Sequence, residues 1–319
     1  MNIELIDAAA VRARLPMRRC IEAMASAMSA VSAGTVIAPP RLVMPLVDES
    51  GHLFVMPGSA SEPRVYGAKL ISLHPGNPGA GRPAIQGFVA LFDHESGAPV
   101  ALIDGAEITA LRTAAASALA TQLLARPDAR TLGILGTSVQ AASHLEAIPL
   151  VREIAEVRVW GRSPQKSAQF VARHARADAA PLRAVASAQE AAACDVVCVV
   201  TGAHEPVIRG AWLNPGSHVN LVGAHTASTR ESDSELIARS RVYVDSIDSA
   251  FSEAGDILIP LQQGAIARSH VIGEIGALLL ERISGRRDAR EITVYKSLGL
   301  VAQDLVAAYA VYAGGGAPD

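Results

Sequence analysis

The chain has 319 residues, which is long for one small domain and predicts about two. Half of the residues are hydrophobic, 18% are charged and the net charge is −3, a balance that is typical of a packed soluble protein and argues against nucleic-acid and polybasic membrane partners. Glu4 and Asp7 precede any apolar run and no apolar stretch reaches the ~20 residues of a membrane span, so we expect neither a signal peptide nor a transmembrane helix. The three cysteines (Cys20, Cys194 and Cys198) form no metal motif, and we expect them to be inert buried thiols of a cytoplasmic protein.

The first third of the chain predicts a helix followed by antiparallel strands. The Ala- and Met-rich segment 18–33 ends at Gly34, the residue type that most often closes a helix. Turn residues at 48–51 and 95–97 predict hairpins between the strands that flank them. Short apolar runs predict strands at residues 41–46, 52–56, 66–73, 86–92 and 99–103.

Beyond this region, apolar strands alternate with helical segments. An Ala-rich helix from about residue 107 to 126 ends before Pro127, which cannot continue it. Buried strands are predicted at residues 132–135, 157–160, 182–186, 195–201, 218–222 and 241–245. A last strand at 292–295 and a helix at 297–312 close the chain. Continuous apolar strands that alternate with helices predict an α/β fold with a doubly wound parallel sheet of the Rossmann type.

Residues 136–141 (GTSVQA) occupy the position of a dinucleotide-binding turn, between the first strand of this region and its helix. Gly136 suits the tight turn, and the helix that follows offers free N–H groups and a positive dipole to a pyrophosphate. Ser138 replaces the usual middle glycine; its Cβ crowds the phosphate, whereas its hydroxyl can bond to it. A helix N-terminus that binds nothing is the alternative. The expected cofactor-binding residues here are Gly136, Thr137, Ser138, Val139 and Gln140.

The second strand of the Rossmann region ends without the acidic residue that accepts the ribose 2′-hydroxyl of NAD. Arg162 and Ser163 stand there instead, and Lys166 follows one turn later. A guanidinium pairs with a 2′-phosphate through its charge and its bidentate geometry, so we favour NADP(H) and keep NAD(H) as the other possibility. A solvated surface arginine is the alternative interpretation of Arg162.

Two cations interrupt elements that are otherwise apolar. Lys69 lies in the middle of a predicted strand, and Arg112 lies on the Ala-rich helix. Such a residue often extends its charge to the surface or pairs with an acid. Two of them within buried elements indicate an anion-binding site, for which Arg41, after two prolines, is a third candidate.

The segment 104–117, with the run LRTAAAS at 111–117, resembles the helix signature of the ornithine cyclodeaminase/mu-crystallin family. Further similar stretches are residues 55–57, 67–69, 219–224 and 296–299, so the resemblance runs essentially from end to end. It implies an α+β substrate and dimerisation domain built from both chain ends, residues 1–119 with 295–319, and a central Rossmann domain that binds NAD(P), residues 120–294. A homodimer is therefore expected.

The resemblance also assigns roles to individual residues. It places Arg41, Lys69 and Arg112 at the positions that grip the substrate α-carboxylate, whose binding orients the α-carbon toward the nicotinamide. Lys69 is also a candidate proton donor, because burial and adjacent guanidinium charges lower the pKa of a lysine. The other cofactor contacts that we expect are Thr113, Thr201, Val222 and Leu298.

Two positions depart from the ornithine cyclodeaminases of this family. Those enzymes resemble one another in two carboxylates, one just before a Met-Pro pair and one just after a Val-Gly-Gly/Ala turn. This chain has Phe54 and His225 there. Ketimine reductases of the mu-crystallin type also lack both acids, and they resemble this chain in the arginine at the end of the second Rossmann strand.

We therefore predict an NAD(P)H-dependent reductase of a cyclic imino acid, such as Δ1-pyrroline-2-carboxylate or Δ1-piperideine-2-carboxylate. Lys69, or a water held by His225, would supply the proton; simple packing of His225 at a strand end is the alternative for that residue. Two other functions stay open: ornithine cyclodeamination to proline and ammonia with NAD, and a mu-crystallin-like binding protein without activity. The expected partners are a small amino or imino acid and a second copy of the chain.

Overall fold

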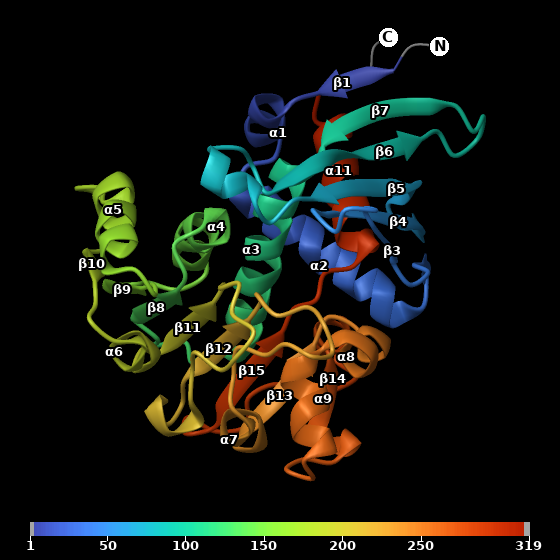
Figure 1. Cartoon of the computed structure of the whole chain (residues 1–319). Coiled ribbons are helices and arrows are strands. Elements are labelled where there is room, and N and C mark those ends of the chain that lie inside the picture. Colours follow the sequence, from blue (N-terminus) through green and yellow to red (C-terminus); the bar gives the residue numbers. More distant parts are fainter. Residues whose placement is uncertain (1–2, 316–319) are drawn as a thin grey trace. The chain divides into compact units, whose positions relative to one another are not determined.

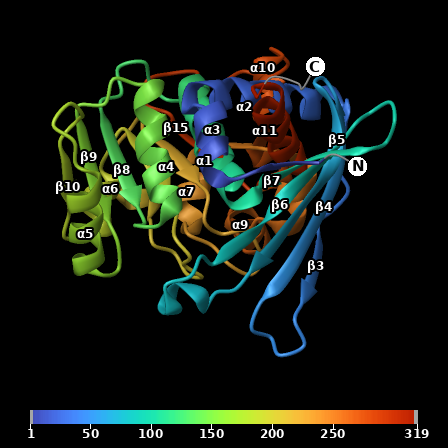
Figure 2. The same ribbon diagram turned by 90° about the horizontal axis from the view of Figure 1, so that it is seen from above.

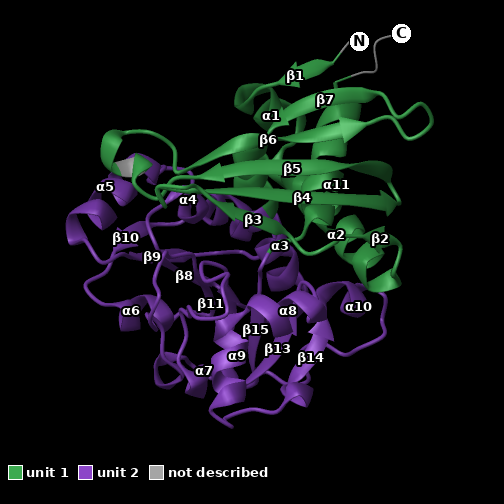
Figure 3. Cartoon of the chain, turned by 45° about the vertical axis from the view of Figure 1, so that its right-hand side comes forward, with its two compact units in different colours: residues 1–112, 299–319 green, residues 113–298 purple. Residues whose placement is uncertain are grey.

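The computed structural model describes residues 3–315, and the chain divides into two compact units (Figure 3). Unit 1 comprises Met1–Arg112 and Gly299–Asp319, and unit 2 comprises Thr113–Leu298. Unit 1 is therefore built from both ends of the chain, and unit 2 from its middle.

Unit 1 contains a seven-stranded sheet of order β1-β7-β6-β5-β4-β2, in which β3 also pairs with β4 (Figure 1). Its strands are β1 (Glu4–Ile6), β2 (Val36–Ile37), β3 (Leu42–Pro45), β4 (His52–Ser61), β5 (Arg64–Leu73), β6 (Ile85–Phe92) and β7 (Pro99–Asp104). Neighbouring strands are antiparallel except β1, which is parallel to β7. The five predicted strands and both predicted hairpins are confirmed. Strands β1 and β2 are additional, because two or three residues are too few to show an alternating pattern.

The helices of unit 1 include α2, which ends as predicted at Gly34 in the left-handed conformation (φ 74°). They are α1 (Ala8–Arg14), α2 (Met17–Ala33), the first part of α3 (Gly105–Leu124) and α11 (Val301–Ala313), with a 3-10 turn, η1 (Asn77–Ala80). Helix α11 packs on the sheet beside α2 (Figure 2). A Cβ added to Gly67 of β5 would lie 3.2 Å from Leu305, so the helix approaches the strand closely. The predicted start of this last helix at residue 297 is wrong, because Gly299 has φ 82° and interrupts the helical path.

Unit 2 is an eight-stranded parallel sheet of order β10-β9-β8-β11-β12-β15-β13-β14. Its strands are β8 (Thr131–Leu135), β9 (Glu156–Trp160), β10 (Leu182–Ala184), β11 (Val196–Val199), β12 (His218–Leu221), β13 (Ser240–Val244), β14 (Val271–Glu274) and β15 (Ile292–Lys296). The chain runs outward from β8 to β10 and then crosses to β11 on the other side of β8. This reversal is the switch point at which doubly wound sheets bind nucleotides, and the predicted Rossmann architecture is confirmed.

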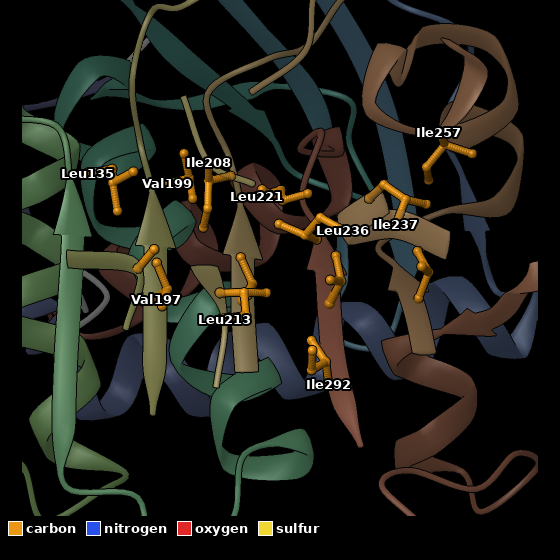
Figure 4. Packing of buried hydrophobic residues seen from close by; sticks show 14 of the residues in the cluster. Leu135, Val197, Val199, Ile208, Leu213, Leu221, Leu236, Ile237, Ile257 and Ile292 are labelled. Carbon is orange, nitrogen blue, oxygen red and sulfur yellow. The ribbon is translucent and has the colours of Figure 1, made fainter. Parts of the chain in front are cut away.

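The helices of unit 2 cover the sheet, and four of them contribute residues to an apolar cluster that includes the last residues of three strands, Leu135, Val199 and Leu221 (Figure 4). They are the remainder of α3, α4 (Val139–Ala147), α5 (Pro164–His174), α6 (Ala188–Ala192), α7 (Ser234–Ala238), α8 (Ile247–Glu253), α9 (Gly255–Gln262) and α10 (Ile275–Leu279), with 3-10 turns η2 (Ile148–Leu150), η3 (Gly210–Trp212) and η4 (Arg268–His270). Burial of these strand ends fixes the points from which the loops of the candidate site leave the sheet. Within residues 3–315, none of the helices has the length and apolar character needed to cross a membrane.

The borders between the units fall a few residues from those expected from the sequence, 119/120 and 294/295. The first border lies inside α3, at 112/113. The second lies at 298/299, because β15 pairs along its whole length with β13 and belongs to unit 2.

Candidate functional site

In unit 1, Lys69 of β5 and Arg112 of α3 meet at one buried carboxylate, Asp304 of α11. Lys69 Nζ donates to Asp304 Oδ1 at 2.9 Å, and Arg112 Nε donates to the same oxygen at 3.0 Å. Arg112 Nη1 also donates to Gln303 Oε1 at 2.9 Å. The exposed fractions are 4% for Lys69, 7% for Arg112 and 0% for Asp304. The two cations are therefore paired, and because a single acid faces both of them, the cluster retains one net positive charge for an anion.

Arg41, the third predicted cation, lies just before β3. Its Nη2 donates to the carbonyl oxygen of Gly299 at 3.1 Å. A Cβ on Gly299 would lie 2.7 Å from Arg112 Nη1, so the absence of a side chain lets the backbone approach the second guanidinium. Gly299 thus contacts both arginines, and Arg41, Lys69 and Arg112 lie in one cluster, which we call the cationic clamp.

The charges of the clamp act on one another. Burial lowers the pKa of Lys69 to about 8; Asp304 opposes this shift, while Arg112 and Arg41 reinforce it. Burial raises the pKa of the Asp304 carboxyl, but the charges of Lys69 and Arg112 outweigh burial and hold that pKa below its ordinary value. The clamp therefore combines an ionised acid with a lysine that is protonated at neutral pH and able to release its proton.

Phe54, at the position where the resemblance implies an acid in the cyclodeaminases, lies on β4. In the β4–β5 register, Met56 is opposite Lys69 and Phe54 is opposite Ile71. Because side chains alternate along a strand, Phe54 and Lys69 are on the same face of the sheet. That face presents an apolar ring beside the clamp.

In unit 2, the turn between β8 and α4 has the features of a phosphate-binding turn. Gly136 has φ 131°, and a Cβ on it would lie 2.7 Å from the carbonyl oxygen of Val200, so the position requires glycine. Helix α4 begins after Ser138, whose side chain makes no capping hydrogen bond. Ser163, by contrast, caps the next helix, α5. Ser138 and Val139 are both exposed, which leaves the N-terminus of α4 accessible to an anion.

The residues present also fit the rest of a dinucleotide. Thr113 Oγ1 is buried and has no hydrogen-bond partner in the part of the chain that the structure describes, so a ligand can satisfy it. Thr137 and Gln140 are partly exposed beside the turn. We therefore regard unit 2 as able to hold NAD(P).

Arg162 and Ser163 at the end of β9 differ in whether their side chains already form a hydrogen bond within the protein. The Ser163 hydroxyl accepts a hydrogen bond from Lys166 N at 3.3 Å and so caps α5. Arg162 is exposed and forms no hydrogen bond or ion pair within residues 3–315. The guanidinium is therefore the group available to a 2′-phosphate, whereas the hydroxyl first serves the helix.

The carboxyl ends of β11 and β12 meet at a buried acid that sequence reasoning missed, Glu231. Its Oε1 accepts from Thr201 N at 2.8 Å and from Thr201 Oγ1 at 2.6 Å. Its Oε2 accepts from Gly223 N at 2.6 Å and from Ala224 N at 3.2 Å. Burial raises the pKa of Glu231 to about 7. The predicted cofactor residue Thr201 therefore uses both its hydroxyl and its backbone N–H within the protein.

The predicted residues Val222 and His225 flank the backbone that Glu231 binds. His225 is exposed, and its Nδ1 lies 3.1 Å from the carbonyl oxygen of Gly223. The ring thus contacts its own loop and is accessible to solvent. Leu298, the last predicted residue, is buried, and its N–H donates to Asp245 Oδ2 at 2.8 Å.

A second buried pair that the sequence analysis missed joins Lys296, at the end of β15, to Asp256 of α9. Lys296 Nζ lies 3.0 Å from Asp256 Oδ2 and donates to the carbonyl oxygen of Ala224 at 2.5 Å. A lysine in an apolar strand was the signal that identified Lys69, and the same signal was available for Lys296. For Asp304, the signal was an acid in the apolar helix 301–313.

No group of three or more His, Cys, Asp or Glu side chains within residues 3–315 is arranged to hold a metal ion. Cys20, Cys194 and Cys198 are buried and form no disulfide bond.

Comparison with known proteins assigns the fold to one family. Residues 3–314 match the model of the ornithine cyclodeaminase/mu-crystallin family. The ketimine reductase mu-crystallin of Mus musculus is 39% identical over 282 residues, 88% of this chain and 85% of the relative. The Δ1-pyrroline-2-carboxylate reductase of Thermococcus litoralis, solved with NADH and L-proline, has a TM-score of 0.94 and 34% identity, covering 98% of this chain and 97% of that one. An archaeal alanine dehydrogenase dimer with bound NAD has a TM-score of 0.92 and 29% identity, covering 99% and 96%. The chain therefore belongs to the ornithine cyclodeaminase/mu-crystallin family.

Proposed function

We propose that this protein is an NAD(P)H-dependent reductase that converts a cyclic imino acid, Δ1-pyrroline-2-carboxylate or Δ1-piperideine-2-carboxylate, into the corresponding cyclic amino acid. The observation that carries the proposal is the cationic clamp, in which Lys69 and Arg112 share the single acid Asp304 and retain a net positive charge. A substrate carboxylate supplies the second negative charge. The relatives named as ketimine reductase and pyrroline-2-carboxylate reductase support the same chemistry.

The clamp residues perform two tasks in this proposal. Arg112 and Arg41 bind the carboxylate and orient the C=N bond of the ring. When bound, the reduced nicotinamide would supply the hydride that the imine carbon receives. Lys69 supplies the proton to the nitrogen, because its pKa of about 8 keeps it protonated at neutral pH. His225, on the turn after β12, is the second candidate for that step, through a water.

Phe54 and His225 favour reduction over cyclodeamination of ornithine. In cyclodeamination the distal ammonium of the substrate must lose a proton before it attacks, and a carboxylate beside it can accept that proton. Phe54 cannot, and a protonated His225 would repel the ammonium. An apolar ring beside the clamp instead suits the methylene groups of a cyclic imine.

A turnover panel tests the proposed function. Oxidation of NADPH and NADH is followed with pyrroline-2-carboxylate and with piperideine-2-carboxylate, and ammonia release is followed with ornithine and NAD. We expect cofactor oxidation with at least one cyclic imine at about 1 per second or faster. Ammonia release at that rate would assign the protein to the cyclodeaminases, and binding of NADPH without any turnover would assign it to the non-enzymatic binders.

We propose that the preferred cofactor is NADP(H), because Arg162 at the end of β9 is exposed and free to pair with a 2′-phosphate. Replacing Arg162 with Ala should weaken NADPH binding by about 1.5–3 kcal/mol, the scale of a hydrogen bond to a charged group, and leave NADH binding nearly unchanged. Isothermal titration with both cofactors measures the difference. Equal losses for NADPH and NADH would contradict the assignment.

We further propose that unit 1 forms the interface of a homodimer. Leu70 is opposite Phe88 and Val55 in the sheet register, on the face opposite to Lys69. Phe88 is 38% exposed, and Leu42 and Leu5 on the same face are 58% and 77% exposed. A broad apolar sheet face of this kind needs a partner, and the alanine dehydrogenase relative is a dimer.

Replacing Phe88 with Glu should convert the dimer into a monomer, because a carboxylate at the centre of an apolar interface is buried without a partner. Light scattering after size-exclusion chromatography measures the mass. Gln189→Glu, at an exposed position of α6, adds the same charge and should leave the dimer intact. A Phe88→Glu variant that stays dimeric, or a wild-type protein that is monomeric, would exclude this interface.

The place of action that we propose is the cytoplasm. The three cysteines are buried and form no disulfide bond, which is typical of proteins in a reducing compartment.

A further inference from the structure

A buried polar network lies at the carboxyl ends of β11, β12 and β15. Its charged members are Glu231, Asp256 and Lys296, each 0% exposed. Burial of three charged side chains is costly unless every one is paired and hydrogen-bonded. Because such burial is costly, we expect the network to fix a segment of backbone whose position matters for function.

Glu231 binds the backbone of two separate strand ends. Each carboxylate oxygen accepts two hydrogen bonds, from Thr201 after β11 and from Gly223 and Ala224 after β12. A Cβ on Gly223 would lie 2.0 Å from the carbonyl oxygen of Thr201 and 2.5 Å from Glu231 Oε1. The two strand ends and the carboxylate are thus packed together closely enough to exclude any side chain at position 223.

Lys296 and Asp256 also help to fix the turn after β12 and the segment that carries Glu231. The N–H of Ala224 donates to Glu231 Oε2, and the carbonyl oxygen of Ala224 accepts from Lys296 Nζ, so this residue is held at both its polar groups. Asp256 Oδ1 accepts from Glu231 N at 3.0 Å and from Ser232 N at 2.9 Å, which fixes the backbone that carries Glu231. Glu231 and Lys296 therefore hold the turn at 222–225. Asp256 in turn binds the backbone of Glu231 and pairs with Lys296.

The position of this turn indicates what it serves. In doubly wound sheets the dinucleotide lies across the switch point, with one mononucleotide on each half of the sheet. The pyrophosphate turn and Arg162 follow β8 and β9, so the adenosine half belongs to that side. The ends of β11 and β12 belong to the other half, which faces the nicotinamide.

We propose that Glu231 is a positioning residue that fixes the turn at 222–225 for the nicotinamide half of the cofactor. This inference rests on the proposed function, because it presumes that the protein binds NAD(P). Glu231 does not touch the cofactor in this account; it acts through the backbone of Gly223 and Ala224 and through Thr201. Its carboxylate accepts all four hydrogen bonds, whereas the amide of a glutamine would turn an N–H₂ group toward two of the donors.

The test compares ligands with and without the nicotinamide. Titration calorimetry on the full-length Glu231→Gln variant measures Kd for NADP⁺ and for 2′-phospho-ADP-ribose, or for NAD⁺ and ADP-ribose if the wild type prefers NAD. We expect Kd for the complete dinucleotide to rise about tenfold or more, on the scale of lost hydrogen bonds to a charged group. Kd for the ligand without nicotinamide should stay within about twofold.

Glu235→Gln is the matched control, because Glu235 is exposed on α7 and makes a surface ion pair with Arg239. It should leave both constants unchanged. If Glu231→Gln does not fold, Glu231→Asp carries the test, since it keeps the charge, shortens the reach and should show a smaller loss with the same selectivity. Equal losses for both ligands, or no loss for either, would overturn the inference. A wild type that binds neither dinucleotide would instead contradict the proposed function.

Discussion

Replacing Lys69 with Met should lower kcat/KM for imine reduction by about 10²–10⁴-fold, the usual contribution of a positioned general acid. The loss combines a missing proton donor with a missing cation beside the substrate carboxylate. The fold should survive, because Asp304 keeps Arg112 as its partner at 3.0 Å and methionine fills most of the volume of the lysine side chain. Steady-state kinetics measure the loss of activity, and thermal unfolding shows whether the fold is retained.

The pH dependence of the wild-type enzyme provides the control for this assignment. The proton donor must be protonated in the free enzyme, so kcat/KM should be highest below the pKa of Lys69 and fall as the pH rises through about 8. The Lys69→Met variant should lose this descending limb. If the limb persists in the variant, another group donates the proton, and His225 becomes the first candidate.

Replacing Asp304 with Ala should lower the free energy of unfolding by about 3–5 kcal/mol, the range found when one partner of a buried ion pair is removed. The variant leaves Lys69 and Arg112, which are 4% and 7% exposed, as adjacent cations without their acid. The pKa of Lys69 should fall further, because Asp304 is the group that opposes the effect of burial. Denaturant unfolding measures the stability, and the pH profile of kcat/KM measures the second effect.

Asp128→Ala is a suitable comparison for the stability measurement. Asp128 lies 3.7 Å from Arg126, and its side chain is 75% exposed. Exposed pairs of this kind contribute about 0–1 kcal/mol. If Asp304→Ala were as mild as Asp128→Ala, the clamp would not depend on its acid, and the account of the site would need to change.

The sequence predicted those features that depend on neighbouring residues. The apolar runs of β8, β11 and β12, the glycine turn at 136 and the helix that follows it are local patterns, and all appear in the structure. Lys69 and Arg112 were identified because a charge in an apolar element is visible without knowing the fold. Strands β1, β2 and β14 were missed. β1 and β2 have too few residues to carry a periodic pattern, and β14 has only two adjacent apolar residues, Val271 and Ile272.

The partners of these charges could not be predicted in the same way. Lys69 and Asp304 are 235 positions apart, and only the packing of α11 on the sheet brings them together. Glu231 lies in an irregular segment, where an acid is ordinarily a solvated surface residue. Its buried environment arises from Asp256 and Lys296, which come from other parts of unit 2. Pairings between distant elements follow from the topology, which a single sequence does not specify residue by residue.

The proposed reaction transfers a hydride to the imine carbon of a substrate held by its carboxylate. The most direct measurement uses reduced cofactor dideuterated at the nicotinamide C4, with Δ1-pyrroline-2-carboxylate and Δ1-piperideine-2-carboxylate as separate substrates and mass spectrometry of the products. We expect proline or pipecolate that is one mass unit heavier, with the deuterium on the α-carbon, and no such product from the Lys69→Met variant at a comparable rate. Oxidised cofactor without a deuterated cyclic amino acid from either imine, or labelled product formed equally well without Lys69, would contradict it.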